Sequence, residues 1–165
     1  MATTNEQVIE SLNRLLAACT RSERGFRIAA ETAKDSELKT IFKASAHQRG
    51  RLASELRMEI RQLRGEPERL EMVDRSEWLS ALGAAASRQD EHGVVAECQG
   101  MNRAVVTAFE SALQDRNLPF ELLVTARRRC DQVVEAAERL TAWATTDTAG
   151  IGRFVLPPVV PPVPA

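Results

Sequence analysis

Apolar residues recur every three or four positions along most of this chain, which is the period of an amphipathic α-helix. Four long segments carry the pattern, and they predict helices over residues 5–34, 37–64, 90–116 and 119–146. Each segment has one apolar stripe that can pack against its neighbours while the opposite face stays polar. The pattern therefore predicts an all-α domain.

Residues with capping chemistry mark the predicted helix ends. Thr3 and Glu6 have the spacing of a capping box at the start of the first helix. Ser36 can cap the second helix, and Gly65 followed by Pro67 predicts its end. Each of the first two helices would then have about 28 residues and a length of roughly 40 Å.

The connection between the second and third long helices is much longer than the other two turns. It spans residues 65–89 and contains a predicted short helix over residues 76–86. Short turns join antiparallel neighbours, whereas a connection of this length can travel along a whole bundle. The order of hairpin, long crossover and hairpin predicts a ferritin-like four-helix bundle within residues 1–147.

The end of the chain departs from the helical pattern. Residues 148–165 contain five of the seven prolines, which favours an extended, polyproline-like segment over a helix. Ile151, Phe154, Val155 and Leu156 make this tail unusually apolar. We interpret these four residues as a candidate partner-binding tail.

Composition argues against several functional classes. The 22 basic and 23 acidic residues nearly balance, so the chain has no global electrostatic reason to bind nucleic acid or an acidic membrane. The three consecutive arginines Arg127–Arg129 point in different directions around a helix, and we interpret them as solvated surface. Cys19, Cys98 and Cys130 lie far apart inside helical patterns, which predicts buried, reduced thiols. With neither a secretory signal nor an apolar stretch of roughly 18 residues, we expect a cytoplasmic protein without a membrane span.

The chemistry expected of a ferritin-like bundle is a carboxylate-bridged di-metal site. Such a site takes a Glu from each of two helices and a Glu-x-x-His pair from each of the other two. This chain has two histidines. His92 lies near a predicted helix start, and His47 lies on a polar face with Ala44 three residues before it. The sequence therefore predicts neither a complete di-metal site nor a catalytic residue.

Four polar residues interrupt the apolar stripes near the middle of the bundle: Glu23, Gln48, Glu55 and Asn102. An inward carboxylate needs hydrogen bonds or a cation, because burying it alone is costly. One interpretation is a buried polar layer that fixes the register of the helices. A second is a divergent iron or manganese site with Glu23 and Glu55 as ligands. A third leaves Glu23 partly solvated and without a role.

Several segments of the chain carry a family resemblance. They are Ser22–Phe26, Ala29–Glu31, Leu38–Phe42, Ala46–Arg49, Ala53–Leu56, Gly65–Pro67 and Glu97–Gly100. Together they resemble a bacterial ferritin-like four-helix-bundle domain family of unknown function. The resemblance implies a ferritin-like fold and a bacterial origin, without an established activity. The chain has Met101-Asn102 and Val134-Glu135 where the family carries acidic residues and histidine, so both departures remove potential ligands.

A second resemblance concerns the tail. Residues 150–154 resemble the short C-terminal peptides by which ferritin-like cargo docks into encapsulin shells. The other interpretation of the tail is that it packs on its own bundle or on a neighbouring copy.

Taken together, these patterns favour a self-associating helical bundle with a structural or protein-interaction role, no enzymatic activity and no cofactor. An iron- or manganese-dependent oxidase or storage-type protein is the first alternative. A cargo or adaptor protein that docks through its tail to a shell or partner is the second.

Overall fold

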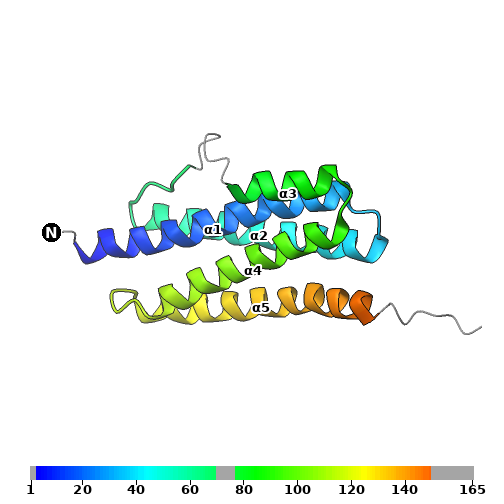
Figure 1. The fold of residues 1–165 in the computed structure, drawn as a ribbon. Helices are drawn as coiled ribbons and strands as arrows, with labels where there is room; N and C mark the ends of the chain where they lie inside the picture. The colour runs from blue at the N-terminus through cyan, green and yellow to red at the C-terminus, as the bar shows by residue number, and fades with distance from the viewer. Residues whose placement is uncertain (1–2, 70–76, 150–165) are drawn as a thin grey trace, which may run out of the picture.

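The computed structural model describes residues 3–69 and 77–149. Within these ranges the chain forms five helices and no strand. The helices are α1 (Thr4–Thr32), α2 (Ser36–Gln62), α3 (Glu77–Ser87), α4 (Glu91–Leu113) and α5 (Phe120–Ala149) (Figure 1). None of them combines the length and the apolar character needed to cross a membrane. The predicted tail residues Ile151, Phe154, Val155 and Leu156 lie outside the described ranges.

The helix starts show which capping predictions hold. The Thr3 side chain accepts a hydrogen bond from the Glu6 N–H, and the Thr3 N–H donates to the Glu6 carboxylate at 2.7 Å, which confirms the capping box. The prediction that Ser36 caps α2 is wrong, because the N-cap is Asp35. Its carboxylate accepts from the Leu38 N–H at 2.8 Å. A charged acceptor at this end also interacts favourably with the helix dipole.

The end of α2 is built around a left-handed residue that is not glycine. Arg64 has a φ of 61°, and the Gly65 N–H donates to the Ile60 carbonyl at 2.9 Å. This is the hydrogen bond by which many helices close their C-terminus. A Cβ on Gly65 would lie 2.8 Å from the Ile9 side chain. Glycine at position 65 therefore lets α1 approach closely, while Arg64 supplies the left-handed turn.

Four long helices lie side by side, and α3 covers part of α1 and α4 (Figure 1). α1 and α5 run in one direction, whereas α2 and α4 run in the opposite direction (Figure 1). Contacts join α1 to α2, α1 to α4, α4 to α5 and α2 to α5. The α1–α2 contact is the most extensive and the α2–α5 contact is sparse, so α5 packs mainly on α4.

The apolar core has two halves along the bundle. One half includes Leu16, Leu56 and Phe109, and the other includes Phe42 and Leu140. Between these halves, α1, α2 and α4 bring polar side chains into the interior: Ser22, Ser45, Arg49 and Asn102. The three cysteines are buried and have no disulfide, as the helical pattern predicts: Cys19, Cys98 and Cys130.

Two side chains fasten the connections to the helices. Asn13 is buried in α1, where its amide donates to the Glu66 carbonyl at 3.1 Å and accepts from the Glu68 N–H at 2.8 Å. The segment after α2 is therefore held along α1. At the other end of the bundle, the Glu91 carboxylate accepts from the backbone N–H groups of Lys34 at 2.6 Å and Asp35 at 3.1 Å.

Candidate functional site

The four polar residues predicted to share a layer separate into three environments. Gln48 and Asn102 are joined in the middle of the bundle by Arg49. Glu23 instead pairs with Arg27 one turn later in α1, with an N–O distance of 2.5 Å. Glu55 takes part in an ion pair between α2 and α5.

Arg49 is the centre of the polar layer. Its side chain is fully buried, and Nη2 donates to Asn102 Oδ1 at 2.7 Å. Nη1 donates to Gln48 Oε1, and Gln48 Nε2 donates to the Gln132 carbonyl at 3.0 Å. The guanidinium carbon lies 5.8 Å from the centre of the Phe26 ring. Arg49 therefore ties together α2 and α4 directly, α5 through Gln48, and α1 through an aromatic face.

The charge of Arg49 has no carboxylate partner among the ion pairs of the described residues, and its Nε makes no hydrogen bond. Burial lowers the pKa of Arg49 to about 10, an effect that the neighbouring Cys19 partly opposes. The side chain therefore remains a cation at neutral pH. Burial likewise raises the pKa of the Cys19 thiol to about 11, although Arg49 and Arg129 act in the opposite direction. Cys19 is a neutral thiol beside a buried cation.

Glu23 faces the backbone of α2 rather than the centre of the layer. Its Oε1 lies 2.8 Å from the position that a Cβ on Gly50 would take. The missing side chain of Gly50 leaves room for this carboxylate, which Arg27 then neutralises at 2.5 Å. Glu23 thus has a cation partner of its own and does not approach the Arg49 guanidinium within ion-pair distance.

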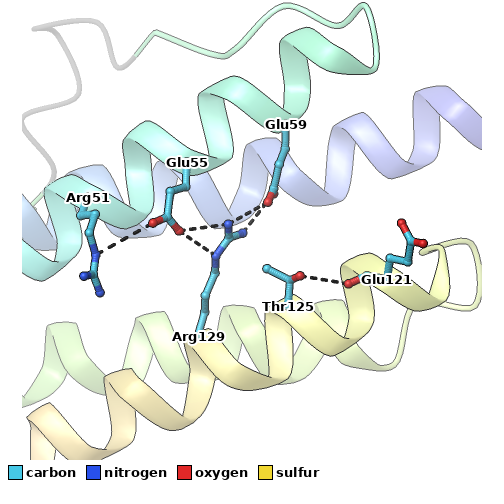
Figure 2. Close-up of polar contacts among 6 residues, drawn as sticks. All are labelled: Arg51, Glu55, Glu59, Glu121, Thr125 and Arg129. Carbon is cyan, nitrogen blue, oxygen red and sulfur yellow. Dashed lines mark hydrogen bonds and ion pairs between the residues drawn. The ribbon is translucent and has the colours of Figure 1, made fainter.

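The second polar cluster, Glu55–Glu59–Arg129, joins α2 to α5 (Figure 2). Arg129 donates to both carboxylate oxygens of Glu59, at 3.0 and 2.7 Å, and to Glu55 Oε2 at 3.2 Å from Nε. The Arg129 side chain is only 7% exposed. Burial alone would lower its pKa, but the hydrogen bond and charge of Glu59, together with Glu55, raise the pKa above the usual value. The prediction that all of Arg127–Arg129 is solvated surface is therefore wrong for Arg129.

The donor atoms of the described residues do not fit a di-metal centre. Within the described ranges, no group of three or more His, Cys, Asp or Glu side chains is placed to hold a metal ion. Glu23 and Glu55, the two candidate ligands, already neutralise Arg27 and Arg129. A divalent ion in the central layer would also meet the Arg49 charge in a low-dielectric interior, where repulsion is strong.

Two surface grooves flank α5 beside the central layer. The α2–α5 groove has a volume of about 560 Å³, and Ile41, Ala44 and Ala136 form part of its lining next to Gln48. The α4–α5 groove has a volume of about 410 Å³, and Asn102 forms part of its lining. Glu37, Arg51, Glu135 and Arg139 place charges of both signs around the first groove.

The domain of unknown function DUF2383 matches residues 7–115 of the chain. The chain belongs to this family. No curated protein matches it. The DUF2383 region contains Arg49, Asn102 and both carboxylates of the second cluster, whereas Arg129 and Gln132 follow it in α5.

Sequence reasoning missed three residues of the two clusters: Arg49, Glu59 and Arg129. The spacing of Arg49 could have predicted that it is buried. It follows Ser45 by four positions and precedes Leu52 by three, so it lies on the apolar stripe of α2. Arg129 similarly follows the buried Ala126 by three positions. The pairing of Arg129 with Glu59 had no local signal, because the two residues are 70 positions apart.

Proposed function

We propose that this chain is a ferritin-like four-helix bundle that acts as a structural or protein-interaction module rather than as a di-metal enzyme. The four long helices contact one another in a closed cycle, and α3 lies between α2 and α4 in the chain. Both features support a bundle with a long crossover between its second and third long helices. The DUF2383 assignment is compatible with this proposal and adds no activity of its own.

The observation that carries the proposal is the buried guanidinium of Arg49. Ferritin-like di-metal proteins bring Glu and His ligands from all four helices to the interior of the bundle. In the central layer of this chain, α2 and α4 instead contribute a buried arginine and the two amides that accept its hydrogen bonds. Amide oxygens around a fixed cation are suited to hold helices in register, and they lack the negative charge that the carboxylate ligands of a di-metal site supply.

The surface supports a role in binding other proteins or further copies of the chain. The α2–α5 groove combines an apolar lining at Ile41, Ala44 and Ala136 with charged residues of both signs. Interfaces often combine an apolar centre with a polar rim in this way. We propose self-association as the first interaction to examine, by size-exclusion chromatography with light scattering over a range of protein concentrations.

Metal analysis tests the proposal directly. Protein purified from its native host should contain substoichiometric iron and manganese by elemental analysis. Anaerobic addition of Fe(II) followed by oxygen should give neither oxygen consumption nor a new absorbance band. Stoichiometric metal, or oxygen uptake that saturates with Fe(II), would establish the oxidase or storage-type alternative instead. A ferritin of known activity serves as the positive control.

A further inference from the structure

The positive charge of Arg49 in the central layer is not paired with a carboxylate of the described residues. Buried arginines normally pair with carboxylates, because an isolated charge in the interior is costly. Arg49 is fully buried, yet its hydrogen-bond partners are two neutral amides, Gln48 and Asn102. Its Nε is buried and makes no hydrogen bond.

We infer that this layer is a cation site that the chain fills with its own guanidinium, whereas ferritin-like di-metal proteins hold metal ions in the interior of the bundle. The inference rests on the proposed function and deepens it, because it names the occupant of the site.

The surroundings of Arg49 are those of a cation site. Asn102 and Gln48 both turn amide oxygens toward the guanidinium, and amide oxygens are neutral dipoles whose negative end stabilises a cation. The face of the Phe26 ring, 5.8 Å away, adds the negative side of an aromatic quadrupole. Gln48 is itself oriented by its bond to the Gln132 carbonyl at 3.0 Å. All four long helices thus contribute to holding one positive charge.

This arrangement also explains why the layer should reject free metal ions. A guanidinium remains charged at neutral pH and cannot leave, because it is part of α2. A divalent ion that approached the same oxygens would meet the repulsion of this charge, and no carboxylate of the described residues forms an ion pair with Arg49 to offset it.

The competing explanation is that Arg49 only fills volume and that its charge is irrelevant. Replacing Asn102 by Asp separates the two, because the substitution keeps the shape and places a carboxylate where an oxygen already lies 2.7 Å from Nη2. If the layer holds an unneutralised cation, Asn102→Asp should raise the melting temperature at neutral pH by several degrees. In an Arg49→Met background the same substitution should lower it, because the new carboxylate is then buried without a partner.

The coupling between the two substitutions decides the question. A positive effect of Asn102→Asp that is lost or reversed in Arg49→Met supports the cation site. An equal effect in both backgrounds would overturn it. Should Arg49→Met fail to fold, the pKa of the introduced carboxyl in Asn102→Asp, measured by NMR, gives the same decision. A nearby cation lowers that pKa below its ordinary value, and burial without one raises it.

The pH dependence supplies a further check with a fixed sign. Because Arg49 lowers the folded-state pKa of the introduced carboxyl, the gain should be full above the ordinary carboxyl pKa. It should disappear as the pH falls through the lowered value. A gain that persists unchanged into strong acid would contradict the cation site.

Melting with Mn(II) or with EDTA distinguishes this inference from the proposed function. Neither reagent should shift the melting temperature of the wild type. If Mn(II) stabilises the wild type while the Arg49 coupling is present, a metal binds elsewhere, so the proposed function fails and the cation site stands. If Mn(II) has no effect and the coupling is absent, the cation site fails alone.

Discussion

Arg129 of α5 donates two hydrogen bonds, of 3.0 and 2.7 Å, to the Glu59 carboxylate of α2 (Figure 2). Elsewhere these two helices make few contacts with each other. A guanidinium that donates twice to one carboxylate fixes both distance and orientation. The position of α5 relative to α2 therefore depends on this side-chain pair more than on close packing of the two helices.

Arg129→Met should destabilise the protein by about 2–3 kcal/mol, since it leaves Glu55 and Glu59 facing each other without their shared cation. The figure lies below that of a fully buried pair because Glu55 is 42% exposed. Urea denaturation measures the loss. Arg128→Met is the matched control, because Arg128 is exposed and adjacent, and it should change stability by less than about 0.5 kcal/mol. Similar losses in the two variants would argue against the pair.

Ser11→Ala should reduce the acid sensitivity of the fold. The Ser11 hydroxyl donates to the Asp115 carboxylate, and this hydrogen bond, together with that from the Asn117 N–H, lowers the pKa of Asp115. A lowered folded-state pKa contributes stability above the ordinary carboxyl value, and that stability is lost as the pH falls through the folded-state pKa. NMR titration should show the Asp115 pKa rising in Ser11→Ala, while Ser111→Ala, at an exposed serine in α4, leaves it unchanged.

Asn13→Leu should loosen the segment that follows α2. The substitution removes both hydrogen bonds to Glu66 and Glu68, and two bonds of about 1 kcal/mol each predict a loss of about 2 kcal/mol. Hydrogen exchange at the Glu68 amide should also become faster in this variant, because the amide loses its acceptor. Arg14→Ala is the control at the next position, where an exposed pair with Glu10 contributes about 0.3–0.5 kcal/mol. Unchanged protection of the Glu68 amide would rule out this role for Asn13.

Arg64→Gly should stabilise the protein by about 1 kcal/mol, because Arg64 adopts a left-handed backbone that costs a residue with a Cβ roughly this amount. Arg64→Ala retains the Cβ and should give no such gain. The melting temperatures of the two variants separate the effect of the backbone conformation from the effect of losing the arginine side chain. A gain of equal size in both would show that the side chain, and not the backbone angle, is responsible.

The sequence predicted the helices well because their apolar period is regular over many turns. The long helices begin and end within three residues of the predicted positions. The residues of the two polar clusters were harder to predict from the sequence. Gln48 and Asn102 were predicted as polar residues on apolar stripes, but Arg49 was not, because arginine is rarely fully buried. The partner of Glu55 is fixed only when α5 docks on α2, which no local pattern encodes.

One carboxylate oxygen of Glu91 accepts the backbone N–H groups of Lys34 and Asp35, so it binds the link between α1 and α2 to the first turn of α4. These two hydrogen bonds connect three helix termini: the end of α1, the start of α2 and the start of α4. Local opening at any one of them releases the other two, and we expect their amides to exchange with solvent at one common rate, as a single cooperative unit.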